Sequence, residues 1–229
     1  MEQLHNGLTL DTGSDAFPLS TDSMLLAHFV KLPKNARVLD LGSGCGTLGL
    51  LLCARDGGCT VTGIELSERA HALALENIRR NALGARLFSI CGDFRRVAPT
   101  LPCGSFHVCL SNPPYFSGGQ ASRAHPLARR EDCCRPAELF SAAARCLRYG
   151  GDFFLVHRPE RLAQLCACSV SAGLEPKRLL LVRHRAESPI SLILLQCRKG
   201  GKPGLKTEEI CLFESDGSPT RAYRDIYHL

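Results

Sequence analysis

The chain has 229 residues and a hydrophobic content of 45%, enough to bury the core of one sizeable domain. Its start, Met1 to His5, lacks a basic region followed by an apolar one, and no apolar run approaches the roughly 20 residues that a membrane-spanning helix needs. These features argue against a membrane protein, and we expect an untargeted cytoplasmic chain with no membrane partner.

The net charge of +6 is unevenly distributed. Residues 1–120 hold ten Lys and Arg against ten Asp and Glu, whereas residues 121–229 hold eighteen against twelve. Eight of the basic residues fall within 175–206, where only Glu175 and Glu187 oppose them. Such a concentration suits a nucleic-acid backbone, and a solvated basic face is the alternative.

The thirteen cysteines are odd in number, form no CxxC motif and mostly lie in apolar runs. This pattern indicates free, buried thiols in a reducing compartment. Two groupings, Cys133 with Cys134 and Cys166 with Cys168, lack a recognisable metal-ligand spacing. We therefore expect no metal.

The first elements in chain order are an irregular segment over 1–23 and an apolar helix over 24–30. Thr21 or Asp22 is placed to cap that helix, and a role for Thr21 in a ligand pocket is the alternative. We expect residues 1–30 to form a segment beside the substrate and cofactor pocket.

Strands and helices then alternate. Apolar runs predict strands over 36–41, 59–66, 86–91, 106–110 and 151–157, separated by helices over 47–55, 67–81, 137–147 and 159–172. This rhythm predicts a mostly parallel sheet with helices on both faces. Two further runs over 177–185 and 189–198 have only a short connection, which indicates a terminal antiparallel hairpin. We expect a single domain over 1–229, with a core over 36–199 and a C-terminal extension over 200–229.

A glycine-rich turn follows the first strand of this core. Gly42, Gly44 and Gly46 permit a tight turn and let a ligand approach the backbone. With Gly49, the same glycines also satisfy the dinucleotide pattern GxGxxG, and Glu65 ends the second strand where it can take ribose hydroxyls. A nicotinamide-dependent oxidoreductase is therefore one alternative.

Two other carboxylates favour S-adenosylmethionine (SAM) as the ligand. Asp40 precedes the first glycine by two positions, where it can orient the ammonium group of SAM. Asp93 follows the third strand, where it can accept a hydrogen bond from the adenine amino group, while Phe94 provides an apolar wall. Ligands of open parallel sheets lie beyond the carboxyl ends of the strands, where all these residues fall.

A rigid tip follows the fourth strand at Asn112, Pro113, Pro114 and Tyr115. The prolines remove two amide donors and end the strand. The amide oxygen of Asn112 and the carbonyl of Pro113 can then each accept an N–H from an exocyclic amine, while Tyr115 stacks on the heterocycle. This set predicts a pocket for a planar substrate that carries an amino group.

The sequence resembles the bacterial tRNA1(Val) (adenine-N6)-methyltransferase family, whose members are class I SAM-dependent methyltransferases. Residues 40–46 match the first motif, Glu65 the second, Asp93 the third, and residues 112–115 the NPPY motif of amino methyltransferases. Flanking stretches over 6–8, 17–26, 157–162, 175–179 and 199–204 extend the resemblance over nearly the whole chain. It implies a Rossmann-like α/β fold with a mostly parallel seven-stranded sheet.

The resemblance also implies N6-methylation of an adenine in RNA, with the adenine beside the anticodon of a tRNA as the leading target. We expect Arg129, Arg130, Lys199 and Lys202 to contact RNA phosphates. The alternatives that keep the fold are methylation of an amino group on an rRNA or DNA base, or of a protein glutamine. A catalytically silent RNA-binding relative is a further alternative, although we find no damaged core motif.

Overall fold

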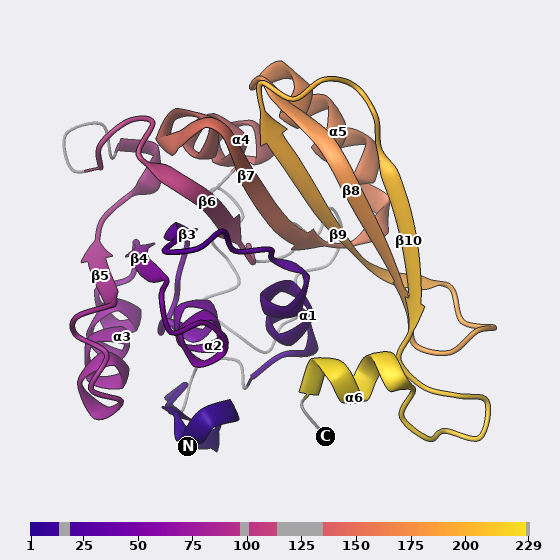
Figure 1. The fold of residues 1–229 in the computed structure, drawn as a ribbon, viewed down its shortest axis with the longest axis horizontal. Coiled ribbons are helices and arrows are strands. Elements are labelled where there is room, and N and C mark those ends of the chain that lie inside the picture. The colour runs from indigo at the N-terminus through magenta and orange to yellow at the C-terminus, as the bar shows by residue number, and fades with distance from the viewer. Residues whose placement is uncertain (14–18, 97–100, 114–134, 228–229) are drawn as a thin grey trace, which may run out of the picture.

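A computed structural model of the chain describes residues 1–13, 19–96, 101–113 and 135–227, and the fold is given for these (Figure 1). The strands are β1 (Glu2–Gln3), β2 (Thr9–Leu10), β3 (Arg37–Leu41), β4 (Thr60–Glu65), β5 (Leu87–Cys91), β6 (Phe106–Ser111), β7 (Leu147–His157), β8 (Leu174–Arg183), β9 (Ile190–Lys199) and β10 (Lys206–Cys211). The α-helices are α1 (Thr21–Phe29), α2 (Thr47–Arg55), α3 (Glu68–Arg80), α4 (Pro136–Cys146), α5 (Leu162–Ser171) and α6 (Arg221–Tyr227). Short 3-10 helices are η1 (His5–Gly7), η2 (Phe94–Arg96) and η4 (Pro159–Arg161).

The central sheet has the strand order β10-β8-β9-β7-β6-β3-β4-β5. Among the strands of this sheet that the structure describes, β9 alone runs antiparallel to its neighbours, β7 and β8. The mostly parallel sheet and the terminal antiparallel hairpin are thus confirmed.

The predicted number of seven strands is wrong, because β10 adds an eighth beside β8. This strand comes from the segment that we expected to be a C-terminal extension. Its sequence, KTEEIC, carries charged residues where strands are usually recognised by apolar ones. Their partners are Arg178 and Arg183 on β8, which form ion pairs with Glu208 and Glu209.

Helices cover both faces of the sheet, and each face has its own apolar cluster. One cluster joins α1, α2, α3 and α6 to the sheet, and the other joins α4 and α5 to the opposite face. Alternate residues of one strand enter different clusters, as the period of two requires. On β9, for example, Leu194 belongs to the first cluster and Leu195 to the second. The central strands β3, β6, β7 and β9 are therefore buried on both faces.

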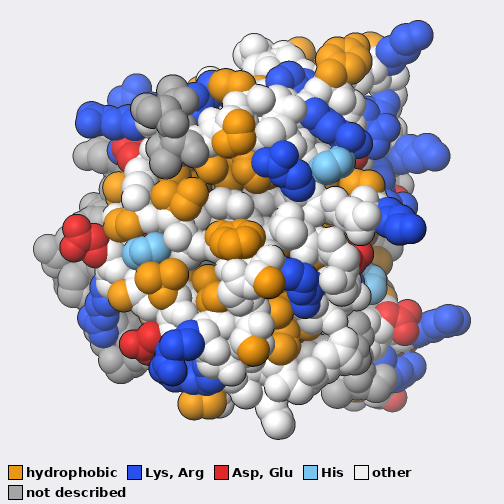
Figure 2. Space-filling view, turned by 60° about the vertical axis from the view of Figure 1, so that its left-hand side comes forward, with side chains coloured by type: hydrophobic (Ala, Val, Ile, Leu, Met, Phe, Trp, Pro, Cys, Tyr) orange, Lys and Arg blue, Asp and Glu red, His pale blue; other side chains and the backbone are white. Residues whose placement is uncertain are grey.

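The side of the molecule formed by β5 and α3 is brought forward in Figure 2, which shows hydrophobic side chains near its middle and basic ones around them. β5 is the last strand of the sheet there. Its Phe88 is 45% exposed and Leu75 of α3 is 47% exposed.

No helix among the described residues is both long and apolar enough to cross a bilayer.

The predicted cap of α1 is one residue off. Ser20, and not Thr21 or Asp22, is the N-cap, because its backbone is extended and its hydroxyl accepts a hydrogen bond from the amide of Ser23. Thr21 and Asp22 are already helical. The position of the cap matters for the site, because it places Ser23 in the first turn of α1, where its hydroxyl contacts Asn112 at the end of β6.

The parallel strands all end at one edge of the sheet, which we call the carboxyl edge. Asp40, Glu65, Asp93 and Asn112 lie at or just beyond the ends of β3, β4, β5 and β6. The candidate residues that the sequence spreads over more than seventy positions are thereby brought to one edge.

Candidate active site

The glycine-rich turn links β3 to α2 and crosses closely over β4. The amides of Gly42 and Ser43 both donate to the carbonyl of Ile64, at 2.9 and 3.1 Å. Gly46, the N-cap residue of α2, has a φ of 87°, which favours glycine. A side chain at Gly63 would place its Cβ 2.6 Å from the Ser43 hydroxyl, so β4 also needs a glycine at this crossing.

Asp40 lies beneath this turn and is only 1% exposed. Neither of its carboxylate oxygens has a hydrogen-bond partner among the described residues. Burial, followed by the nearby charge of Glu65, raises the pKa of Asp40 to about 8. The Ser43 hydroxyl lines the same narrow pocket and is equally without a partner in the described chain.

A buried carboxylate without donors is unfavourable, and a bound cation removes that penalty. Asp40 therefore fits the ammonium group of an amino-acid ligand. The glycines of the turn leave its backbone accessible on the other side. These residues thus fit the methionine part of SAM.

Glu65 is held in place by the turn itself. Its Oε2 accepts a hydrogen bond from the amide of Gly44 at 2.9 Å, and its Oε1 accepts one from Ser67 at 2.7 Å. Each oxygen keeps a second lone pair, so a fixed and half-buried carboxylate remains able to accept from ribose hydroxyls. Holding the turn and binding a ligand are therefore compatible roles for Glu65.

Asp93 is engaged by an arginine that sequence reasoning missed. The Arg95 guanidinium contacts both carboxylate oxygens at 2.7 to 3.0 Å, and the Arg95 amide donates to Oδ1. These hydrogen bonds lower the pKa of Asp93. Phe94 is half-buried and packs against the cluster beneath α4 and α5, consistent with an apolar wall.

Asn112 stands directly after β6. The Ser111 hydroxyl donates to the carbonyl of Leu41 at 2.7 Å, which fixes the tip of β6 against the end of β3. The Nδ2 group of Asn112 donates to the Ser23 hydroxyl at 3.1 Å, while its Oδ1 has no partner among the described residues. Pro113 is buried, and Pro114 and Tyr115 lie outside the described residues.

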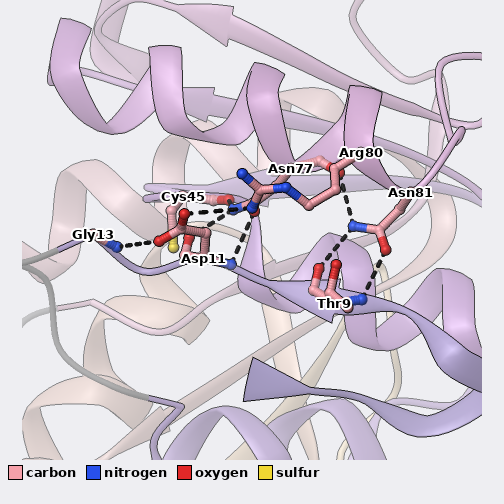
Figure 3. Close-up of polar contacts among 7 residues, drawn as sticks. All are labelled: Thr9, Asp11, Gly13, Cys45, Asn77, Arg80 and Asn81. Atoms are coloured by element: carbon pink, nitrogen blue, oxygen red, sulfur yellow. Dashed lines mark hydrogen bonds and ion pairs between the residues drawn. The ribbon is translucent and has the colours of Figure 1, made fainter. Parts of the chain in front are cut away.

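The N-terminal segment is joined to the site through Asn77 of α3 and Asn81, the C-cap residue of that helix (Figure 3). Asn77 accepts from the Asp11 amide at 2.9 Å and donates to the Asp11 carbonyl at 2.8 Å. The same Nδ2 donates to the carbonyl of Cys45 in the glycine-rich turn at 3.0 Å. Asn81 exchanges two hydrogen bonds with Thr9 in the same manner. The only signal in the sequence is a pair of asparagines four positions apart on an amphipathic helix.

Thr21 lies in the first turn of α1, two residues before Ser23. Its hydroxyl accepts a hydrogen bond from Tyr227 of α6. The predicted pocket residue is thus near the site, and its hydroxyl has a partner from the C-terminal segment.

The expected RNA contacts that the structure describes, Lys199 and Lys202, do not lie at the carboxyl edge. Lys199 ends β9, which runs in the opposite direction, and Arg198 pairs with Asp152 near the middle of β7, away from its carboxyl end at His157. Along the strand direction, Lys199 lies about five residues, roughly 16 Å, from Asn112. Its ammonium group donates to the Leu147 carbonyl at 2.8 Å. Arg129 and Arg130 lie outside the described residues.

The hairpin formed by β8 and β9 also carries less net positive charge in the folded chain than its own sequence indicates. Arg178, Arg183 and Arg198 form ion pairs with Glu208, Glu209 and Asp152, respectively. These acids come from β10 and β7, outside the stretch in which charges were counted. At the carboxyl edge, Arg96, Arg158 and Arg185 follow β5, β7 and β8 and are exposed, and Arg158 donates to the Ser191 carbonyl.

Comparison with known proteins gives one family and one fold. A family model described as the methyltransferase small domain matches residues 18–165. Three relatives are named tRNA1(Val) (adenine(37)-N6)-methyltransferase. The protein from Tolumonas auensis is 31% identical over 90% of this chain and 86% of its own length. Those from Photobacterium profundum and Bacteroides fragilis are 28% and 30% identical, over 90% and 76% of this chain and 88% and 74% of their own lengths.

Solved structures show the same fold at lower identity. A predicted O-methyltransferase from Agrobacterium tumefaciens has a TM-score of 0.77 at 24% identity, covering 91% of this chain and 96% of its own. A geranyl diphosphate C-methyltransferase from Streptomyces coelicolor, solved with S-adenosyl-L-homocysteine, has a TM-score of 0.58 at 12% identity, covering 77% and 76%. These similarities confirm the Rossmann-like fold.

Proposed function

Since this chain belongs to the methyltransferase small domain family, and within it to the tRNA1(Val) (adenine(37)-N6)-methyltransferases, we propose that it methylates the exocyclic N6 of an adenine in a tRNA. Membership of the family makes it a methyltransferase with SAM as its cofactor. The observation that supports an amine as the methyl acceptor is the position of Asn112, which follows β6 at the carboxyl edge, where β6 ends beside β3.

The acceptor nitrogen needs help because its lone pair is delocalised into the purine ring. In the proposed complex, Oδ1 of Asn112 and the carbonyl of Pro113 each accept one N–H of the amine. This directs the lone pair out of the ring plane, and Tyr115 is proposed to stack on the base. The nitrogen lone pair would form the N–C bond as the bond between the methyl carbon and the sulfonium sulfur breaks, its electron pair staying on a neutral thioether. The nitrogen, which then carries the positive charge, would release its proton to solvent. Such positioning can supply about 7–11 kcal/mol of the barrier.

The bound cofactor supplies an electrophilic methyl group on its sulfonium. We assign its ammonium group to Asp40, its ribose hydroxyls to Glu65, and its adenine amino group to Asp93, with Phe94 beside the ring. The backbone at Gly42, Gly44 and Gly46 lines the methionine part, and Thr21 remains a candidate contact from α1. Support for this assignment comes from the unpartnered Asp40 carboxylate and from the fixed Glu65.

The tRNA must approach the carboxyl edge to place a base at Asn112. We propose that exposed arginines of this edge, Arg96, Arg158 and Arg185, meet its phosphates first. Lys199 and Lys202 remain candidates for more distant contacts, because a tRNA is large enough to extend beyond one edge. Arg129 and Arg130 stay predictions from sequence.

The test is methyl transfer from labelled SAM to separate pools of tRNA, rRNA, DNA and protein, followed by mass spectrometry of the nucleosides. We expect N6-methyladenosine in the tRNA pool. The Asn112→Ala enzyme should lose at least 100-fold in transfer while its affinity for SAM stays within twofold. Label confined to rRNA, DNA or a protein glutamine would overturn the tRNA assignment and favour the corresponding acceptor.

A further inference from the structure

We propose that Ser23 is a positioning residue for methyl transfer, because its hydroxyl holds the carboxamide of Asn112 with Oδ1 turned toward the acceptor. The two residues are 89 positions apart, and the hydrogen bond from Nδ2 to the Ser23 hydroxyl is 3.1 Å long. The inference rests on the proposed function, since it assigns how Asn112 is set for that reaction.

The position of Ser23 is otherwise one for an apolar residue. Ser23 is 7% exposed, and the other buried residues of α1 are Met24, Leu25, Leu26, Ala27 and Phe29. Packing alone would be satisfied by alanine, as it is at Ala27. A buried hydroxyl is stable only when it is hydrogen-bonded, and here its partners are Ser20, within the same helix start, and Asn112, from the distant tip of β6.

The Ser23 hydroxyl is itself held by the N-cap. The Ser20 hydroxyl accepts from the Ser23 amide at 3.2 Å and donates to the Ser23 hydroxyl at 3.2 Å. Because the cap ties Ser20 to the first turn of α1, the oxygen that receives Nδ2 has a defined place. The chain of contacts therefore runs from the start of α1 to the tip of β6.

Asn112 needs this restraint because its two ends have opposite chemistry. The last torsion of an asparagine is broad, and its oxygen and nitrogen differ little in size. With Oδ1 toward the acceptor, the carboxamide attracts an N–H of the amine. With Nδ2 in that place, two donors would face each other. The Nδ2–Ser23 bond narrows the torsion and, with the Ser20 hydroxyl bonded to the same oxygen, holds Nδ2 on the Ser23 side and leaves Oδ1 for the acceptor.

The experiment compares steady-state kinetics of the wild type with Ser23→Ala, Ser23→Thr and the matched control Ser20→Ala. Ser23→Ala should lower kcat by 10- to 100-fold while the KM for tRNA and the Kd for SAM stay within twofold. Ser20→Ala removes both the cap bond and the bond to the Ser23 hydroxyl, so it should lower the urea midpoint and also lower kcat, but by less than Ser23→Ala does, because the Ser23–Asn112 bond remains. Ser23→Thr retains a hydroxyl and should recover most of the lost kcat.

A second readout needs no RNA. In ¹⁵N NMR of the enzyme, one Nδ2 proton of Asn112 should exchange slowly with solvent, and Ser23→Ala should abolish that protection. An unchanged kcat in Ser23→Ala, an equal loss in Ser20→Ala, or unaltered exchange would overturn the positioning role. A wild-type enzyme that methylates no tRNA would instead overturn the proposed function, and the exchange experiment would still decide on the Ser23–Asn112 bond.

Discussion

The hydroxyl of Tyr227 donates a 3.1 Å hydrogen bond to Oγ1 of Thr21, joining residues 206 positions apart. Tyr227 also stacks on Tyr223 with ring centroids 4.3 Å apart, and the neighbouring Ile226 is buried in the cluster that contains α1. The C-terminal segment therefore packs on the helix that carries Ser23.

Tyr227→Phe keeps the stacked ring and removes only the hydroxyl. We expect it to lower the free energy of unfolding by about 1 kcal/mol, the typical net contribution of one hydrogen bond. Thr21→Val should have a similar effect in urea denaturation. The double variant should lose little more than either single one, because both remove the same bond. Fully additive losses would show that the bond contributes nothing.

Asn77→Leu tests the connection between the N-terminal segment and the glycine-rich turn. The substitution keeps the size of a fully buried side chain and leaves three backbone groups of Asp11 and Cys45 unpaired. We expect a loss of roughly 2–4 kcal/mol in the free energy of unfolding and faster proteolysis within residues 1–13. Affinity for SAM, measured by calorimetry, should fall several-fold because Cys45 belongs to the turn.

The matched control is Asn81→Leu. Asn81 is the C-cap residue of the same helix and bonds Thr9, but it makes no bond to the turn. It should speed proteolysis of the N-terminal segment while SAM affinity stays within twofold. An equal loss of SAM affinity in both variants would show that the turn is not held through Asn77.

The sequence predicts most of the sheet because its strands carry the signal locally. Apolar runs end in glycine, carboxylate or proline, and the structure brings those ends together at one edge. Ser23 and Asn77 carry no such signal. Each is an ordinary polar residue in a helix, and its partner lies 89 or 66 positions away. Their contribution depends on tertiary contacts that a local pattern does not contain.

The same reason explains why the sequence did not predict β10 and why it overstated the basic character of the hairpin formed by β8 and β9. Glu208 and Glu209 make β10 look like a surface segment, yet they pair with Arg178 and Arg183 across the strand boundary. Counting charges within 175–206 therefore overstates the basic character of that stretch. The direction of β9 is a second feature that the sequence prediction of RNA contacts missed, because this antiparallel strand ends with Lys199 away from the carboxyl edge.

Charge reversal at the two edges distinguishes where the tRNA binds. Arg158→Glu with Arg185→Glu changes the carboxyl edge, and Lys202→Glu with Lys206→Glu changes the opposite edge by the same charge. All four side chains are exposed. We expect the arginine pair to raise the Kd for tRNA at least tenfold and to reduce its salt dependence by about two phosphate contacts, with SAM affinity unchanged. A larger effect of the lysine pair in salt-dependent filter binding would place the RNA over the opposite edge.

Asp40 should make both stability and cofactor binding depend on pH. Its pKa is about 8 in the folded enzyme, against a usual value near 3.8, so between these values the folded enzyme holds a proton that the unfolded chain releases. Stability of the cofactor-free enzyme should therefore fall as pH rises through this window, and Asp40→Asn should flatten the fall.

Binding of the SAM ammonium needs the carboxylate, so SAM affinity should rise up to tenfold per pH unit between pH 5.5 and 7.5. The Asp40→Asn enzyme should bind SAM at least tenfold more weakly and without that slope. Calorimetry that finds the same pH dependence in wild type and Asp40→Asn would assign the proton to another group.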